Sequence, residues 1–227
     1  MNIKKTVLFL LSCFFPFFAI SQESNSSKSW SYKGYSGGMF VHTGYMQSKK
    51  FSVFDIKNNE IEMQIKGATF GLGGKMGVFL HRNFRVGAEG YFSTCKYNSG
   101  KYMNQLITEK GSCRIGWGGV TFDLLFPVKK FAPFMGVTIG GGSAKHLIFI
   151  ERKHNNHVAT PIVHFSNPLI IINPAIGAEF FATKRISLLL KLDYMFNVQQ
   201  NKLPSLTNNT YPRGVRLYFG IHFYHKK

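Results

Sequence analysis

The chain has 227 residues, of which 17% are charged and 15% are aromatic, and its formal net charge is +18. Soluble domains usually carry about 25% charged residues, so the composition argues against an ordinary soluble protein. After the first segment, the sequence offers no run of the roughly 20 apolar residues that a membrane-spanning helix needs. A chain that is rich in Phe, Tyr and Gly but has no such run is typical of a transmembrane β-barrel. The apolar side chains of barrel strands alternate with polar or small ones and so form no continuous apolar segment.

The first segment has the layout of a secretory signal peptide. Lys4 and Lys5 precede an apolar stretch at residues 7–20, and Ala19-Ile20-Ser21 forms a small-x-small cleavage site. An uncleaved anchor and a lipoprotein modified at Cys13 are weaker alternatives, because the apolar stretch is too short to span a membrane and continues past the cysteine. We therefore expect Sec-dependent export of a mature chain.

The rest of the chain alternates between strand-like runs and loops. We divide it into a signal peptide (1–21), a flexible lead-in (22–36) and a barrel domain (37–227). Eight strands are expected at about residues 37–47, 67–80, 84–96, 112–126, 131–146, 166–181, 186–199 and 213–225.

The connections between these strands alternate strictly between short and long. The short ones are 81–83, 127–130 and 182–185, and the long ones are 48–66, 97–111, 147–165 and 200–212. Bacterial outer-membrane barrels have short periplasmic turns and longer outer loops. The sequence therefore predicts an all-β fold, an up-and-down antiparallel barrel of eight transmembrane strands with both termini in the periplasm.

Strand side chains alternate with period two. Five of the expected strands, at 67–80, 84–96, 166–181, 186–199 and 213–225, accordingly have one apolar face and one face of small, polar or charged residues. In the seventh strand, for example, Leu188 and Leu190 alternate with Lys191 and Asp193. A soluble lipocalin-like barrel would turn its apolar face inward. We favour the membrane barrel, because the opposite faces are rich in glycine and balance their charges.

The fourth strand departs from this pattern. Val120 and Phe122 alternate well, but Ile115 and Trp117 have the opposite parity. A β-bulge at Gly118-Gly119 would bring all of them onto one face.

Charged residues of the non-apolar faces form the main candidate site. Four cations and four anions are expected to point inward: Lys75, Arg85, Glu89, Asp123, Glu179, Lys191, Asp193 and Arg216. Eight strands enclose an interior that side chains can just fill, and unpaired charge there is costly. The set is interpreted as a salt-bridged plug, with a polar conduit for small solutes as the alternative.

Two cysteines remain after signal removal, Cys95 and Cys113, placed symmetrically about residue 104. Simple hairpin pairing sets them opposite each other and facing inward. The oxidising periplasm permits a disulfide there, and two separate buried thiols are the alternative.

No metal or cofactor site is expected. Seven histidines show no tight spacing with Cys or carboxylate ligands, and three of them lie in the long loop 147–165: His42, His146, His154, His157, His164, His222 and His225.

One short motif raises an enzymatic alternative. His164-Phe165-Ser166-Asn167 is similar to the His-x-Ser-Asn of outer-membrane lipid A deacylases, in which the histidine activates the serine as nucleophile. The resemblance implies a lipid-facing site. It departs from that family at Pro168, and Glu179 has the parity of the interior.

The long loops are net basic, and Lys49, Lys50, Arg152 and Lys153 are candidate polyanion contacts. Excess positive charge can bind nucleic acid. For an exported barrel, anionic headgroups and lipopolysaccharide are the expected partners instead.

Three segments carry a wider resemblance: Ala132-Pro133-Phe134-Met135-Gly136-Val137, Asn173-Pro174-Ala175-Ile176-Gly177-Ala178-Glu179-Phe180 and Lys184-Arg185-Ile186-Ser187-Leu188. With Leu192-Asp193-Tyr194 and an aromatic last strand, the chain resembles the porin-like outer-membrane β-barrels abundant in Bacteroidota. The resemblance implies the fold, an outer-membrane location and contact with the barrel-insertion machinery. It leaves three functions: a closed structural or surface-interaction barrel, a narrow channel, or a lipid-modifying enzyme.

Overall fold

The computed structural model describes residues 34–54, 60–81, 83–98, 107–154, 157–159, 162–198 and 212–226. Within these ranges, the side chains at 51–63, 97–110, 148–165 and 226 are not described. The predicted signal peptide and most of the predicted lead-in lie outside the described residues.

Strands make up most of the described chain. They are β1 (Gly34–Gln47), β2 (Phe51–Phe54), β3 (Glu60–Met63), β4 (Lys66–His81), β5 (Phe84–Asn98), β6 (Ile107–Leu125), β7 (Phe131–His154), β8 (His157–Ala159), β9 (Ile162–Phe181), β10 (Ile186–Asn197) and β11 (Arg213–Lys226). Among the residues listed above as described, no helix is long and apolar enough to cross a membrane.

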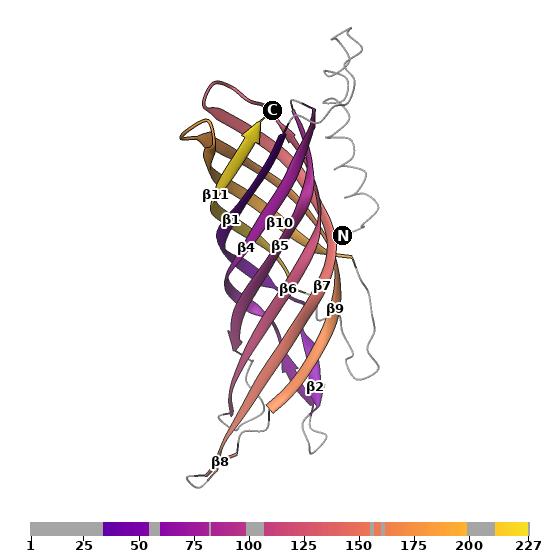
Figure 1. Ribbon diagram of the computed structural model, residues 1–227. Helices are drawn as coiled ribbons and strands as arrows, with labels where there is room; N and C mark the ends of the chain where they lie inside the picture. The colour runs from indigo at the N-terminus through magenta and orange to yellow at the C-terminus, as the bar shows by residue number, and fades with distance from the viewer. Residues whose placement is uncertain are drawn as a thin grey trace. The chain divides into compact units, whose positions relative to one another are not determined.

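Eight of these strands close into one antiparallel barrel (Figure 1). The order around the ring is β6, β5, β4, β1, β11, β10, β9, β7, and β7 pairs back to β6. β2 and β3 form a separate hairpin between β1 and β4, and β8 pairs with the end of β7. The predicted fold class, an eight-stranded antiparallel barrel in up-and-down order, is therefore confirmed.

The two ends of the barrel differ. Gly34 lies beside Lys226, so the described strands begin and finish at one end, which we call the turn end. The short connections lie at this end too, and in one of them the hydroxyl Oγ1 of Thr183 accepts hydrogen bonds from the backbone N–H groups of Arg185 and Ile186. The opposite end, which we call the loop end, carries β2, β3 and β8 (Figure 1).

At the loop end, several strands run past the limits expected from sequence. β6 begins at Ile107, and β7 continues to His154. These segments belong to the stretches 97–111 and 147–165, which were expected to be long loops. Pairing with neighbouring strands nevertheless satisfies their backbone groups, since β6 and β7 stay in register from Leu125↔Phe134 to Ile107↔Arg152.

The predicted bulge at Gly118-Gly119 is wrong. β5 and β6 keep unbroken register from Phe84↔Leu124 to Asn98↔Lys110. Ile115 and Trp117 therefore point into the barrel, where they are 1% and 5% exposed. Apolar side chains occupy the interior near the loop end, so these two residues have no need to face outward.

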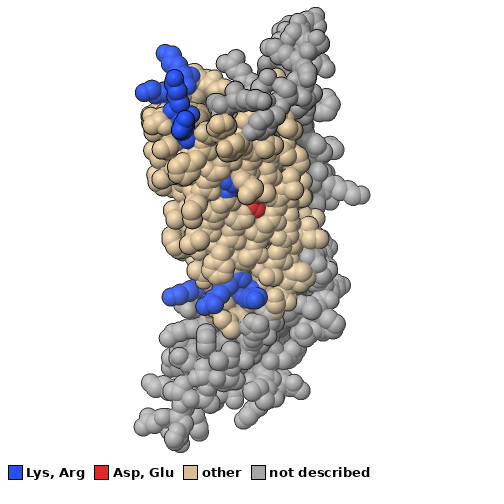
Figure 2. Space-filling model, viewed as in Figure 1, with Lys and Arg blue, Asp and Glu red and all other residues tan. Residues whose placement is uncertain are grey.

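The outer wall of the barrel is apolar. Met39, Phe70 and Leu190 are 71%, 57% and 52% exposed, and the outward positions of neighbouring strands are similar. On the face drawn in Figure 2, Lys and Arg gather mainly at the two ends of the described surface, and the surface between them is uncharged except for one small blue and one small red area. The apolar parity therefore faces out, which overturns the lipocalin-like alternative.

Candidate functional site

All eight charged residues of the candidate site lie inside the barrel, and each is at most 6% exposed. They come from β4, β5, β6, β9, β10 and β11, at inward positions of the alternation. The four carboxylates are the only Asp and Glu side chains that the structure describes. The described part of the chain thus keeps all its negative side-chain charge in the interior.

Some ion pairs join neighbouring strands. Arg216 on β11 lies opposite Asp193 on β10 and donates two parallel hydrogen bonds to it, at 2.9 Å from Nε and 2.8 Å from Nη2. Tyr218 donates a third to the same carboxylate, at 2.8 Å. Such a bidentate pair is stronger and more directional than a single contact.

Other ion pairs cross the interior. Lys191 Nζ on β10 lies 2.5 Å from Glu89 Oε1 on β5. Three strands separate β5 from β10 in either direction around the ring, so this pair spans the full width of the barrel.

Arg85 links two other carboxylates. Its Nε donates to Asp123 and its Nη2 to Glu179, both at 2.9 Å. Lys75 Nζ completes the group at 2.7 Å from Asp123 Oδ2. The structure therefore brings all eight predicted charges together into one connected network. Its two longest links are Lys75 Nζ to Glu89 Oε2 at 3.9 Å and Lys191 Nζ to Asp193 Oδ2 at 4.0 Å.

Aromatic side chains surround the cations. The Arg216 guanidinium lies 4.2 Å from the Tyr91 ring centroid, and Lys191 Nζ lies 4.2 Å from the Tyr218 centroid. Tyr91 also reaches across the interior, with its hydroxyl 3.6 Å from Met195 Sδ. The sequence analysis did not assign either tyrosine to the site. The available signal was strand parity, because Tyr91 shares that of Glu89 on β5 and Tyr218 shares that of Arg216 on β11.

Inward glycines make room for these large groups. A Cβ at Gly136 would overlap the carboxylate of Asp123, and a Cβ at Gly177 would come within 2.6 Å of the Phe134 ring. The glycine-rich inner faces seen in the sequence therefore allow charged and aromatic side chains to fill a narrow interior.

The two cysteines lie in the loop half of the interior. Cys95 is directly opposite Cys113, and they are 1% and 0% exposed. Both thiols are free in the structure. Directly opposed strand residues have Cα separations of about 4.5 to 5.5 Å, within the range that a disulfide accepts, so the disulfide stays a prediction.

The deacylase-like motif is placed only in part. Ser166 is exposed on β9, whereas the side chain of His164 lies outside the described residues. Glu179 faces the interior and is bonded to Arg85. Among the described side chains, no carboxylate lies on the outer wall to orient a histidine there.

Most of the other residues that the sequence suggested for polyanion or metal binding lie at the loop end, in the interior or outside the described side chains. Lys49 and Lys50 are exposed just beyond β1, while Arg152 and Lys153 lie in β7 with side chains that are not described. His42, His146 and His222 are buried inside the barrel. The described residues include no group of three or more His, Cys, Asp or Glu arranged to hold a metal ion.

Fold and interior together define a closed antiparallel barrel of eight strands, apolar outside and filled by paired charges inside. No protein-family model matches the chain, and no curated protein matches it. Similar solved structures include outer membrane protein OprG from Pseudomonas aeruginosa, at 9% identity and a TM-score of 0.47, covering 87% of this chain and 98% of that one. They also include Ail of Yersinia pestis in complex with the heparin analogue sucrose octasulfate, at 13% identity and a TM-score of 0.34, covering 85% and 99%.

The outer membrane protease OmpT from Escherichia coli is similar to a comparable degree, at 8% identity and a TM-score of 0.42, covering 88% of this chain and 100% of that one.

Proposed function

We propose that the protein is an integral outer-membrane barrel that is closed along its axis and serves a structural or surface-interaction role. The outer wall supports the location. Met39, Met76 and Phe223 are 71%, 66% and 58% exposed on it, and apolar area of this extent is favourable against lipid but costly against water. The charged groups of the wall's described residues sit at its two ends or inside.

The contact between Lys191 and Glu89 carries the proposal of closure. It bridges opposite sides of the ring at 2.5 Å, and the two side chains are 2% and 0% exposed. Tyr91 crosses at a second level of the barrel, to Met195. A path for solutes would have to break buried, charge-assisted contacts, which are strong when desolvated.

The orientation follows from the two ends. Short turns face the periplasm in bacterial barrels of this kind, so the turn end with Gly34 and Lys226 is periplasmic in this proposal. The loop end then faces outward, toward the lipopolysaccharide leaflet. Lipid, lipopolysaccharide and the barrel-insertion machinery are the proposed partners.

Conductance of the purified full chain in a planar bilayer tests closure. We expect no steady channel events from the wild-type protein. A double variant, Glu89→Ala with Lys191→Ala, removes the central bridge and is expected to raise the conductance. Steady opening of the wild-type protein would favour the narrow channel instead.

A further inference from the structure

Exposed charge on the described outer wall is entirely positive. At the loop end it consists of Lys49, Lys50, Lys66, Lys96, Arg114, Lys145 and Arg213. These residues belong to, or directly follow, six neighbouring strands of the ring, β11, β1, β4, β5, β6 and β7. The described carboxylates all point inward, so none of them neutralises these cations.

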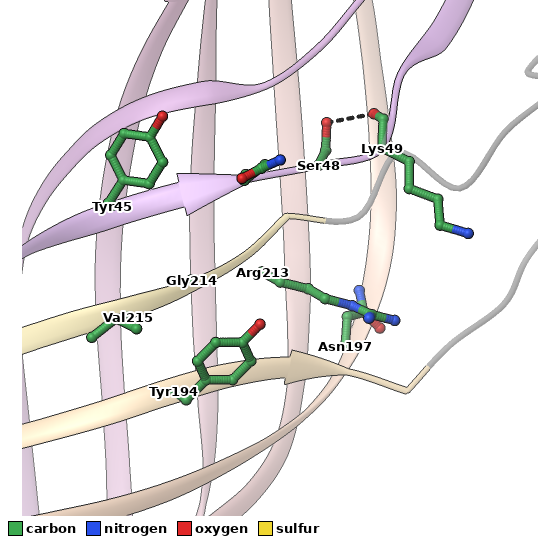
Figure 3. A pocket seen from close by; sticks show the side chains of 9 residues that line it. Tyr45, Ser48, Lys49, Tyr194, Asn197, Arg213, Gly214 and Val215 are labelled. Carbon is green, nitrogen blue, oxygen red and sulfur yellow. Dashed lines mark hydrogen bonds between the residues drawn. The ribbon is translucent and has the colours of Figure 1, made fainter. Parts of the chain in front are cut away.

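A pocket of about 370 Å³ lies among these cations, at the loop end of β10, β11 and β1. Its wall includes Tyr194, Val215 and Tyr45, which are directly opposed on the three strands. Arg213 and Lys49 line the same pocket. Figure 3 shows the two tyrosine rings on either side of β11, with Arg213 and Lys49 beyond them toward the loop end.

Outward residues change character along these strands. On β11, Phe219 and Leu217 are followed by Val215 and then, at the loop end, by Arg213. Tyr45 on β1 lies opposite Val215, in the row between apolar and cationic residues. Apolar, then aromatic, then cationic side chains reproduce the polarity profile from hydrocarbon to headgroup. The pocket therefore lies at the level of lipid headgroups.

We propose that this pocket binds a phosphate group of a phosphorylated glycolipid, lipopolysaccharide, in the leaflet at the loop end. The proposal rests on the proposed function, because it requires the barrel to be inserted in that membrane. The planar fork of Arg213 suits a phosphate, which it can bind through two parallel hydrogen bonds. Lys49 adds a second cation, and the tyrosine rings offer apolar faces to the sugar and to the start of an acyl chain.

Two further cations of the wall point to the same ligand chemistry. Arg114 on β6 and Lys145 on β7 are directly opposed, and both are exposed. Like charges in directly opposed positions destabilise a sheet. A phosphate shared between them would remove this cost. Because β6 lies four strands from β11 in the ring of eight, this phosphate would belong to a second lipid molecule and not to the one in the pocket.

The test compares two double variants of the full chain with the same loss of charge. Lys49→Gln with Arg213→Gln changes the pocket, and Lys129→Gln with Lys130→Gln changes exposed cations at the turn end. Fluorescent lipopolysaccharide is titrated into the detergent-solubilised protein at low salt. We expect the pocket variant to bind roughly 30-fold more weakly, because each cation near an anionic lipid contributes about fivefold, and the turn-end variant to bind like the wild type.

Two further measurements identify the chemical group that the pocket binds. Dephosphorylated lipopolysaccharide should bind as weakly to the wild type as intact lipopolysaccharide binds to the pocket variant. Inorganic phosphate at an equal phosphate concentration should not displace the lipid. Arg213→Lys, which keeps the charge but loses the fork, should fall between wild type and the double variant.

Equal weakening in both double variants would overturn the site, leaving only a general charge effect. Undiminished binding of dephosphorylated lipopolysaccharide would contradict phosphate as the group that the pocket recognises. Displacement by free phosphate would contradict the lipid as the source of that phosphate. Heat-modifiable migration of every sample reports separately on the folded barrel. A folded barrel without pocket-dependent binding contradicts this proposal alone, whereas loss of the folded barrel in the wild type contradicts the proposed function.

Discussion

Glu89 lies close to two buried ammonium groups and is the nearest carboxylate to one of them, that of Lys191. One of its oxygens accepts from Lys191, and the other lies 3.9 Å from Lys75. Removing one partner of a buried ion pair costs about 3–5 kcal/mol, so Glu89→Ala should lower the free energy of unfolding by roughly that amount. Denaturant unfolding of the protein refolded into liposomes measures the loss.

The double variant Glu89→Ala with Lys191→Met is the matched control, since it removes both charges and should recover much of the stability. Wild-type-like stability of Glu89→Ala would contradict the desolvated interior. It would instead indicate a hydrated interior, and with it the channel alternative.

Strand parity alone located every described charged residue of the interior. It did not reveal which cation meets which anion. Lys191 and Glu89 are 102 positions apart, and their pairing depends on β5 and β10 facing each other across the ring. The number of strands and their closure had to be known before this contact could be assigned.

β10 has an apolar outward face. Leu190, at the middle of this strand, is 52% exposed. Leu190→Arg should destabilise the folded barrel by roughly 2–4 kcal/mol, because this is the cost of a cation on the lipid face near the bilayer midplane. The same liposome unfolding measurement applies.

Val128 provides the depth control, because it is 63% exposed in a connection at the turn end. Val128→Arg should cost only about 0–1 kcal/mol, as expected near the interface. Equal costs at the two positions would mean that the wall does not contact a hydrocarbon layer.

β6 shows why a strand can be recognised from sequence while its inward face is misjudged. Alternation of Val120 and Phe122 gave the strand and its outward face. Ile115 and Trp117 were assumed to belong outside because outward residues elsewhere are apolar. Most of the charged side chains of the interior lie toward the turn end, whereas uncharged side chains, many of them apolar, fill it toward the loop end. This change along the axis leaves no mark in a single strand's periodicity.

The apolar wall and the fully paired ring of strands predict where the protein is found in the cell and how it migrates in gels. The barrel should fractionate with the outer membrane. It should also migrate faster in detergent gels before heating than after, because a closed barrel has no open edge at which detergent unfolding begins. Recovery as a soluble periplasmic protein, without a heat-dependent shift, would contradict the membrane location.

The ion pairs that cross the interior also bear on how the barrel assembles. Arg85 and Glu179 are 94 positions apart, and Lys191 meets Glu89 only when opposite sides of the ring face each other. A partly assembled sheet in the membrane would hold these charges without partners, at a cost of several kcal/mol for each ion. Intermediates with an open seam between β1 and β11 are thereby disfavoured, so insertion and closure become one cooperative event.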